Sequence, residues 1–395
     1  MANLNLMQLL SLALVLTASM NATASATAVK AIYWIDQPLF PASSINTSLF
    51  THVYYAFLAP NATSFKLCVS NSTNITLTNF ITTFRSRIPT VTTILSIGGS
   101  NATPFSLIFS NITTRATFIN STISVARAYG FDGVDLDWEF PQNSDDTNNL
   151  GSLFQEWRIA ITADAAITGK PRLVLTAAVY FAVYFSVSDT PWTYPVTSIN
   201  QNVDWVNVMS YNFHGSWNND TGAPSGLFNP TRNISVVDGL KSWIGAGVKP
   251  EKLVMGMPLY GMTWQLQDPN VNGIGAPVVR PDPGSNGAMA YFQVVDFNKQ
   301  RNAKVVYDVD TMSVYSYSGS YWIGYDDPIT VTAKVGYAQA LSLRGYFFWA
   351  AGYDTNNWKI STQETKQIDH SEQEYACKSA SNSVLDWKWQ IKVEL

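Results

Sequence analysis

Eight short apolar runs recur along the 395-residue chain, and each ends in glycine or polar residues. Near-continuous apolar strands are typical of a parallel sheet buried on both faces, and helical patterns fill several gaps between these runs. The runs span residues 31–35, 52–57, 91–98, 131–138, 173–180, 205–211, 253–259 and 345–350. Eight strands that alternate with helices predict an α/β fold, a (β/α)8 TIM barrel. An open doubly wound sheet is the structural alternative, but no G-x-G-x-x-G phosphate loop follows a run.

The spacing of the runs breaks once, between residues 259 and 345. Alternating apolar residues at 305–317, with turn-forming glycine and proline before them, are typical of hairpins. We therefore expect a small α+β insertion at 265–330 within a barrel domain of residues 27–362. The insertion would lie on the C-terminal side of the strands, where barrels keep their active sites. The polar, charged tail at 363–395 has no predicted role in the barrel.

Residues 1–26 are predicted to be a secretory signal peptide. The apolar run 6–16 is shorter than the roughly 20 residues of a membrane span, and small residues with A-x-A spacing follow it. No later run is long enough to span a membrane, so we expect no membrane partner and a secreted protein of the apoplast or vacuole. Nine Asn-x-Ser/Thr acceptors that follow residue 26 fit this route, and several are expected to carry glycan. They are Asn46, Asn61, Asn71, Asn74, Asn101, Asn111, Asn120, Asn219 and Asn233.

Composition excludes several classes of protein. Hydrophobic residues make up 46% of the chain, which argues against disorder, and 24 Lys plus Arg against 28 Asp plus Glu argue against a nucleic-acid partner. Cys68 and Cys377 are the only cysteines, so a scaffold of several disulfides is excluded. The sequence does not decide whether these two cysteines form a single bridge. With two cysteines and no H-x-x-x-H spacing, neither a metal site nor a cofactor is expected. We expect a monomer.

The segment Asp132-Gly-Val-Asp-Leu-Asp-Trp-Glu139 carries the strongest chemical signal. Alternate residues of a strand share a face, so Asp135, Asp137 and Glu139 would project together. Only 13% of the chain is charged, and burial with mutual repulsion would raise the pKa of at least one of these carboxyls. A protonated carboxyl beside an ionised one is what an acid catalyst of glycosidic bond cleavage needs. The alternative, an exposed strand with a wet polar face, conflicts with the apolar residues between the acids.

This segment resembles the D-G-x-D-x-D-W-E signature of glycoside hydrolase family 18, the chitinases and chitinase-like proteins. Two other segments agree in order: 96–99 is similar to the S-x-G-G strand of that family, and 209–212 to its M-x-Y-D strand. The later segments 260–261, 322–327 and 345–349 resemble the plant class V subgroup, whose members are associated with defence. The resemblance runs from about residue 30 to residue 360.

The resemblance implies a secreted chitinase that hydrolyses β-1,4-linked N-acetylglucosamine polymers by a substrate-assisted, retaining mechanism. Glu139 would protonate the glycosidic oxygen, and Asp137 would accept a hydrogen bond from the acetamido N–H. Asp135 would share a proton with Asp137, and Tyr211 would donate its hydroxyl to the acetamido carbonyl. The implied partner is chitin or an N-acetylglucosamine oligosaccharide. The residues implied to bind it are Tyr33, Phe57, Gly99, Met209, Asn212 and Trp349.

Two positions depart from the family pattern: Asn212 stands where Asp is usual, and Phe140 where Tyr is usual. Asn212 removes a negative charge near the acid, so a lectin that binds N-acetylglucosamine oligomers without turnover is the alternative. An inhibitor or storage protein on the same fold is a third functional alternative.

The aromatic faces of Trp217, Trp264 and Trp322 would suit stacking on sugar rings; the alternative is that these residues pack in the core. His52 and His214 are interpreted as structural, with His214 near the cleft.

Overall fold

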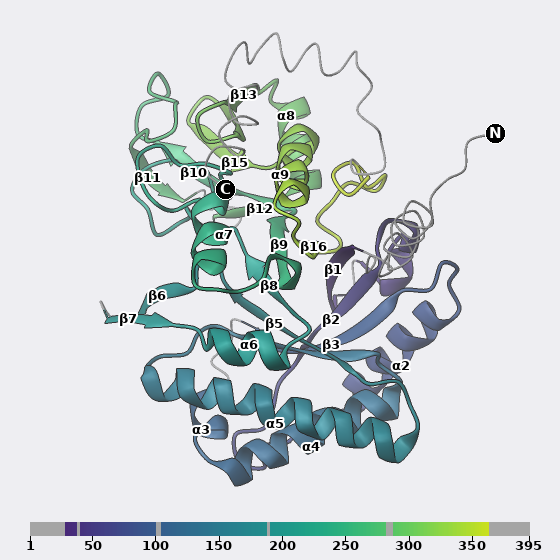
Figure 1. Ribbon diagram of the computed structural model, residues 1–395. Helices are drawn as coiled ribbons and strands as arrows, with labels where there is room; N and C mark the ends of the chain where they lie inside the picture. The colour runs from purple at the N-terminus through teal and green to yellow at the C-terminus, as the bar shows by residue number, and fades with distance from the viewer. Residues whose placement is uncertain (1–27, 38–39, 100–103, 188–189, 282–286, 363–395) are drawn as a thin grey trace, which may run out of the picture.

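The computed structural model describes residues 28–37, 40–99, 104–187, 190–281 and 287–362. Within them, eight parallel strands close into a barrel in the order β1-β16-β9-β8-β5-β4-β3-β2 (Figure 1). The predicted (β/α)8 fold class is therefore confirmed, and every barrel strand coincides with one of the apolar runs. The strands are β1 (Val29–Ile35), β2 (His52–Leu58), β3 (Thr92–Gly99), β4 (Gly133–Trp138), β5 (Val174–Tyr180), β8 (Trp205–Met209), β9 (Leu253–Pro258) and β16 (Gly345–Trp349).

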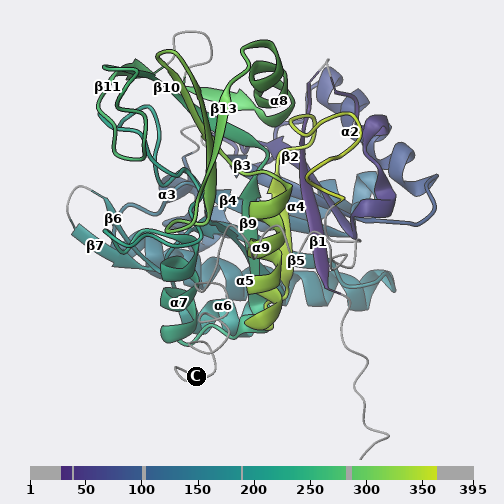
Figure 2. The ribbon, with the colours of Figure 1, turned by 90° about the horizontal axis from the view of Figure 1, so that it is seen from above.

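Helices surround the barrel, as the view from above shows (Figure 2). The longest, α5, begins after the N-cap Asn143, whose side chain accepts the backbone N–H of Asp146, and ends at Gly169 with φ +67°. The helices packed on the barrel are α2 (Asn71–Arg85), α3 (Phe105–Phe109), α4 (Ile112–Tyr129), α5 (Ser144–Thr168), α6 (Val196–Asn202), α7 (Val236–Gly245) and α9 (Pro328–Ala340). Short 3-10 turns are η1 (Ala42–Ser44), η2 (Thr47–Leu49) and η3 (Pro250–Lys252).

The hydrophobic core has two layers, one on each face of the barrel sheet. The outer layer lies between strands and helices and fully buries Phe118, Trp157 and Trp243. The inner layer fills the barrel with Tyr33, Tyr54 and other large side chains. Because the interior is packed rather than open, every polar atom placed there must find a partner or remain unsatisfied.

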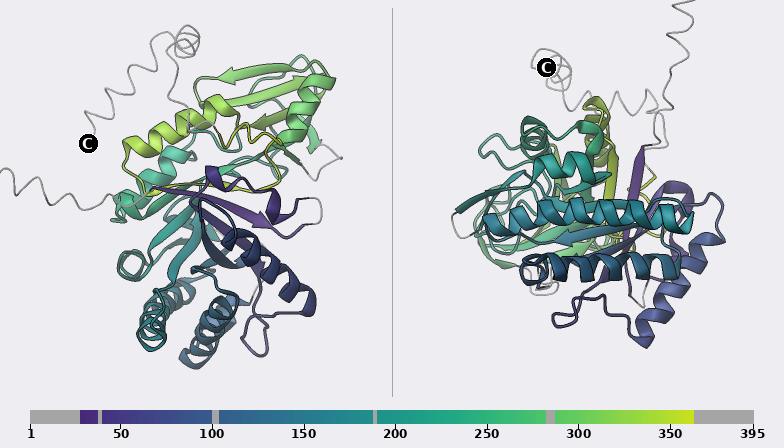
Figure 3. Two further views of the ribbon diagram at one scale, coloured as in Figure 1. Left: turned by 90° about the vertical axis from the view of Figure 1, so that its right-hand side faces the viewer. Right: turned by 60° about the horizontal axis from the view of Figure 1, so that its bottom comes forward.

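A six-stranded antiparallel sheet is inserted between β9 and β16, with strand order β11-β10-β15-β14-β13 and β12 paired to β10. It projects from the side of the barrel opposite α4 and α5 (Figures 1 and 3). Sequence predicts this unit at 265–330, whereas the sheet itself begins at Tyr260, because Leu259 alone separates β9 from β10. Its elements are β10 (Tyr260–Leu266), β11 (Val278–Pro281), β12 (Ala288–Ala290), α8 (Tyr291–Gln300), β13 (Lys304–Asp308), β14 (Ser313–Ser318) and β15 (Tyr321–Tyr325). A separate hairpin joins β6 (Tyr184–Val187) to β7 (Thr190–Thr193).

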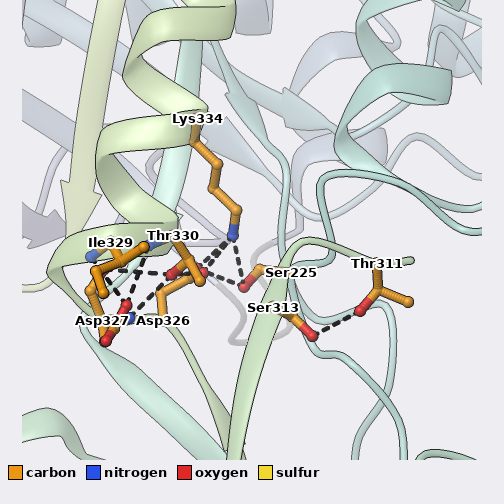
Figure 4. Close-up of polar contacts among 8 residues, drawn as sticks. All are labelled: Ser225, Thr311, Ser313, Asp326, Asp327, Ile329, Thr330 and Lys334. Atoms are coloured by element: carbon orange, nitrogen blue, oxygen red, sulfur yellow. Dashed lines mark hydrogen bonds and ion pairs between the residues drawn. The ribbon is translucent and has the colours of Figure 1, made fainter. Parts of the chain in front are cut away.

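A buried ion pair ties this insertion to the barrel (Figure 4). Lys334 of α9 lies 2.6 and 2.5 Å from the two carboxylate oxygens of Asp326, which follows β15. Ser225, in the loop between β8 and α7, donates to the same carboxylate at 2.6 Å, and Thr330 donates at 2.8 Å. One carboxylate thus joins the insertion, a barrel helix and a loop at the mouth of the barrel.

Several sequence predictions fall outside the described residues: the signal peptide at 1–26, the acceptor Asn101, Cys377 and the tail at 363–395. The other eight acceptor asparagines are all exposed. Cys68 is exposed and free within the described part of the chain. No helix among the described residues is long and apolar enough to cross a membrane.

Candidate active site

The three carboxylates of β4 and its C-terminal end lie at graded depths in the barrel. Asp135 is fully buried, Asp137 is 4% exposed, and Glu139, one residue past the strand, is exposed at the mouth. Their shared face is the inner face of the strand, as the two-residue spacing requires. The first acid of the motif, Asp132, precedes the strand and instead pairs with Arg85 at 2.7 Å.

Asp135 is held by three hydroxyl donors from three strands. Ser96 of β3 donates at 2.7 Å, Thr176 of β5 at 2.6 Å, and Tyr33 of β1 at 3.0 Å. Burial raises the pKa of Asp135, while these hydrogen bonds act in the opposite direction because they stabilise the charged form. Asp135 is therefore anchored in one orientation.

Asp137 has a different environment. Burial raises its pKa well above the usual range, and the nearby charges of Glu139 and Asp135 raise it further. Its Oδ1 atom is buried and has no hydrogen-bond partner among the described residues. Although the Glu139 residue is exposed, its carboxyl is partly desolvated at the barrel mouth, and this raises its pKa as well. Asp137 and Glu139 therefore do not titrate independently, because a charge on one disfavours a charge on the other.

Aromatic rings form a wall beside these carboxylates. Trp349, the last residue of β16, stacks on Phe57 with ring centroids 5.6 Å apart and lies 5.6 Å from the ring of Tyr33. Gly99 ends β3 with φ +93°, and a Cβ atom there would approach the Phe57 ring to 2.8 Å. Only glycine accepts both that dihedral angle and that approach, so Gly99 gives the Phe57 ring its position.

The end of β8 supplies the opposite side. The Tyr211 ring makes edge contacts with Tyr260 at 6.5 Å and Phe347 at 6.2 Å, and Met209 packs on the same interior cluster. Burial raises the pKa of Tyr211 well above its usual value, as do Tyr260, Asp137 and Glu139, so its hydroxyl stays a proton donor at any ordinary pH.

Asn212 adopts a left-handed backbone conformation, φ +60°, which asparagine tolerates better than most residues. Its Oδ1 atom accepts a hydrogen bond from the hydroxyl of Tyr260 at 2.7 Å. Tyr260 comes from the insertion, so the insertion contributes directly to this edge of the site.

All ten predicted site residues thus lie in the barrel interior or at the C-terminal ends of its strands. Sequence reasoning assigned no role to Ser96, Thr176, Asn207 or Tyr260, although polar residues within apolar strands were the available signal. No group of His, Cys, Asp or Glu in the described ranges could hold a metal ion. The functional groups of the site are three carboxyls and a tyrosine hydroxyl beside an aromatic wall. This arrangement suits proton transfer to a bound sugar.

The tryptophans proposed as sugar platforms separate into two kinds. Trp264 and Trp322 are at most 1% exposed and pack in the core of the inserted sheet, so the platform interpretation is wrong for them. Trp217 is 61% exposed and lies over Gly215 in the loop after β8. His214 pairs with Asp220 at 2.9 Å and lines a separate pocket of about 460 Å³ between that loop and the insertion. His52 packs edge-on against Trp205, and burial lowers its pKa to about 4.

Comparison with known proteins agrees with this geometry. The glycosyl hydrolases family 18 model matches residues 27–354. "Nod factor hydrolase protein 1" of Medicago truncatula is 63% identical over 344 residues, covering 86% of this chain and 89% of that protein. A class V chitinase from Nicotiana tobaccum in complex with NAG4 is 37% identical with a TM-score of 0.82, covering 85% of this chain and 97% of that one. A chitinase-like agglutinin from Robinia pseudoacacia is 36% identical with a TM-score of 0.79, covering 85% and 98%. The chain therefore belongs to glycosyl hydrolase family 18 and is a glycosidase of the chitinase type.

Proposed function

We propose that the protein hydrolyses β-1,4-linked N-acetylglucosamine polymers by a substrate-assisted mechanism that retains the anomeric configuration. The observation that carries the proposal is the graded line of carboxyls from buried Asp135 to the open Glu139. Burial raises the pKa of Glu139, which favours the protonated form at the mouth, where a glycosidic oxygen can approach.

In the first step Glu139 gives its proton to the leaving glycosidic oxygen while the substrate's acetamido oxygen bonds to C1. The C1–O bond breaks, and the positive charge spreads over the oxazolinium ring that forms. The buried, unpartnered Oδ1 of Asp137 would accept the acetamido N–H, and the Tyr211 hydroxyl would donate to the acetamido oxygen. In the second step the Glu139 carboxylate removes a proton from water, which attacks C1 and opens the ring.

The Trp349 and Phe57 rings would form the apolar floor beneath the sugar, since ring faces suit the C–H face of a pyranose. They also keep bulk water from the oxazolinium until the leaving group has departed.

Product analysis of a GlcNAc hexamer tests this proposal. The purified protein is expected to release shorter oligomers whose newly formed reducing ends are initially in the β configuration, observed by NMR. A hexamer that binds but stays intact would exclude hydrolysis, and release of α anomers would exclude the retaining route.

A lectin that binds the same oligomers without turnover is the second candidate. Two observations favour it: Asn212 replaces the usual aspartate, and one structural neighbour is a chitinase-like agglutinin. The hexamer experiment separates the two functions, because a lectin predicts binding alone.

Replacing Asn212 with Asp is expected to move the alkaline limb of the kcat profile to higher pH by roughly one unit. Glu139 works only while protonated. Asn212 hydrogen-bonds Tyr260, which interacts with the charge of Glu139, so a negative charge at position 212 would raise the pKa of Glu139. The Tyr260 hydrogen bond remains, since Asp also accepts it. The profile is measured with the hexamer. Asn218→Asp on the same loop is the control, because Asn218 also accepts a hydrogen bond, from the Gly215 backbone. Equal shifts in both variants would contradict a local effect at Asn212.

The name of the 63% identical relative makes a Nod factor a second candidate substrate. Parallel digestion of the hexamer and of a Nod factor at equal concentration, with kcat/KM compared, decides which substrate is preferred.

We also propose that the protein is secreted and carries glycan at several of the exposed acceptor asparagines. Protein purified from plant medium tests both: its N-terminal sequence shows whether the signal peptide has been removed, and a mass shift after deglycosylation shows whether glycan was attached.

A further inference from the structure

The hydroxyl of Tyr33 bridges two walls of the barrel. Tyr33 stands on β1, and its buried hydroxyl donates to Oδ2 of Asp135 on β4 at 3.0 Å. The same oxygen accepts a hydrogen bond from Nδ2 of Asn207 on β8 at 2.8 Å. Asn207 is completely buried and neighbours Ala178 of β5 and Val254 of β9 in the barrel sheet.

The Asn207 amide determines the direction of this bridge. A hydroxyl has one proton, and an amide NH2 group can only donate. While Nδ2 of Asn207 faces Tyr33, the Tyr33 proton must therefore point to Asp135. The opposite amide orientation would offer Oδ1 as an acceptor and draw the proton away from Asp135.

The arrangement leaves one polar atom unsatisfied. Oδ1 of Asn207 is buried without a hydrogen-bond partner in the part of the chain that the structure describes. An unsatisfied buried acceptor is unfavourable, so a side chain serving only to fill space would be better replaced by leucine. The donor function of Asn207 gives a reason for an amide at this position.

We propose that Asn207 is a positioning residue that, through Tyr33, keeps the negative charge on Asp135 and leaves the shared proton on Asp137. Asp135 then receives three donors, whereas Oδ1 of Asp137 receives none from the described residues. The carboxyl with three donors is the one that holds charge most easily. This inference rests on the proposed hydrolysis, in which Asp137 must accept the substrate N–H beside a negatively charged Asp135.

Few other titratable groups surround Tyr33 and Asp135 among the described residues. Strands β3 and β5 present the hydroxyls of Ser96 and Thr176, and β9 and β16 present apolar Val254 and Phe347. The titratable neighbours of Tyr33 and Asp135 are Asp137 on β4 and Tyr54 on β2, which Asn207 also contacts by a hydrogen bond. Asp137 in turn interacts with Glu139 and Tyr211 at the barrel mouth. The tyrosines have raised pKa values from burial and stay neutral, so a change in the acidic limb of activity reports on the carboxyls.

The test is the pH dependence of kcat/KM on the GlcNAc hexamer for Tyr33→Phe, Asn207→Leu and the double variant. Losing donors makes Asp135 take up a proton at higher pH, so the acidic limb should move upward. We expect about one pH unit for Tyr33→Phe and about half a unit for Asn207→Leu. Because Asn207 acts through the Tyr33 hydroxyl, the double variant should shift no further than Tyr33→Phe alone.

Trp205→Phe is the matched control. Trp205 lies on the same strand and face as Asn207, and its Nε1 donates to the Tyr54 hydroxyl at 3.2 Å, not to Tyr33. The acidic limb of the kcat/KM profile of Trp205→Phe should be the same as that of the unaltered protein. Thermal unfolding identifies variants that fail to fold, and Tyr33→Phe, which removes one oxygen, then supplies the measurement. An unchanged limb in Asn207→Leu or additive shifts in the double variant would overturn the inference. If the unaltered protein leaves the hexamer intact, the proposed function fails instead.

Discussion

Glu139→Gln should lower kcat on a GlcNAc hexamer by about 1,000-fold or more while the protein still binds the sugar. Gln keeps the size of Glu and its ability to hydrogen-bond, but it has no proton to give to a glycosidic oxygen. General acid catalysis by a positioned side chain contributes typically 10²–10⁴-fold. In the proposed mechanism Glu139 also removes the proton from water, so two steps lose their catalyst.

Binding and turnover have to be measured separately for this variant. Calorimetry with the hexamer gives the affinity, and chromatography of the products gives kcat. Glu156→Gln is the matched control, because Glu156 lies on α5 outside the barrel and pairs with Arg115 at 2.7 Å. It should retain turnover. A Glu139→Gln protein that keeps more than a tenth of the original kcat would remove Glu139 from the role of acid.

The barrel was predictable because each strand is buried on both faces. A strand such as β9 has apolar side chains on both sides, so its sequence is a continuous apolar run with clear ends. The hairpin β6–β7 was not predicted, since the apolar sequence of β5 continues through residues 181–183 into β6 and gives no sign of a second strand. The start of the insertion was misplaced by five residues because β9 continues almost directly into β10, with no turn residues between them.

The site was predictable where its residues cluster in the sequence and not where the barrel gathers them. Asp135, Asp137 and Glu139 are two residues apart, so strand geometry alone places them together. Asn207 and Tyr33 are 174 positions apart, and their contact depends on the closure of the barrel. The burial of Trp264 and Trp322 depends likewise on how the inserted sheet packs, which composition does not reveal.

Lys334→Met should destabilise the protein by about 3–5 kcal/mol. Lys334 and Asp326 are both buried, and the ammonium group lies 2.5 Å from the carboxylate (Figure 4). Removing the lysine leaves a buried carboxylate without its counter-charge, which is far more costly than losing a surface contact. Burial also lowers the pKa of Lys334 while Asp326 opposes that change, so the two charges depend on each other.

A second substitution separates the unpaired charge from the lost packing. Lys334→Met with Asp326→Asn removes both charges, and the single amide oxygen of Asn can still accept one of the two hydrogen bonds that Ser225 and Thr330 donate to the carboxylate oxygens. This double variant should recover much of the lost stability, measured as the free energy of unfolding in guanidinium chloride. Arg172→Met is the surface control: its pair with Asp204 is 2.9 Å long but the arginine is 45% exposed, so about 0–1 kcal/mol is expected.

The same ion pair also bears on the site, through the loop between β8 and α7. Asp326 holds Ser225, and the carbonyl of the preceding residue, Pro224, accepts the backbone N–H of Phe213 at 2.9 Å, next to Asn212. Lys334→Met should therefore raise KM for the hexamer at a temperature where the variant is still folded, whereas Arg172→Met should not. Equal stability and equal KM in the two single variants would mean that the buried pair neither stabilises the insertion nor holds that loop.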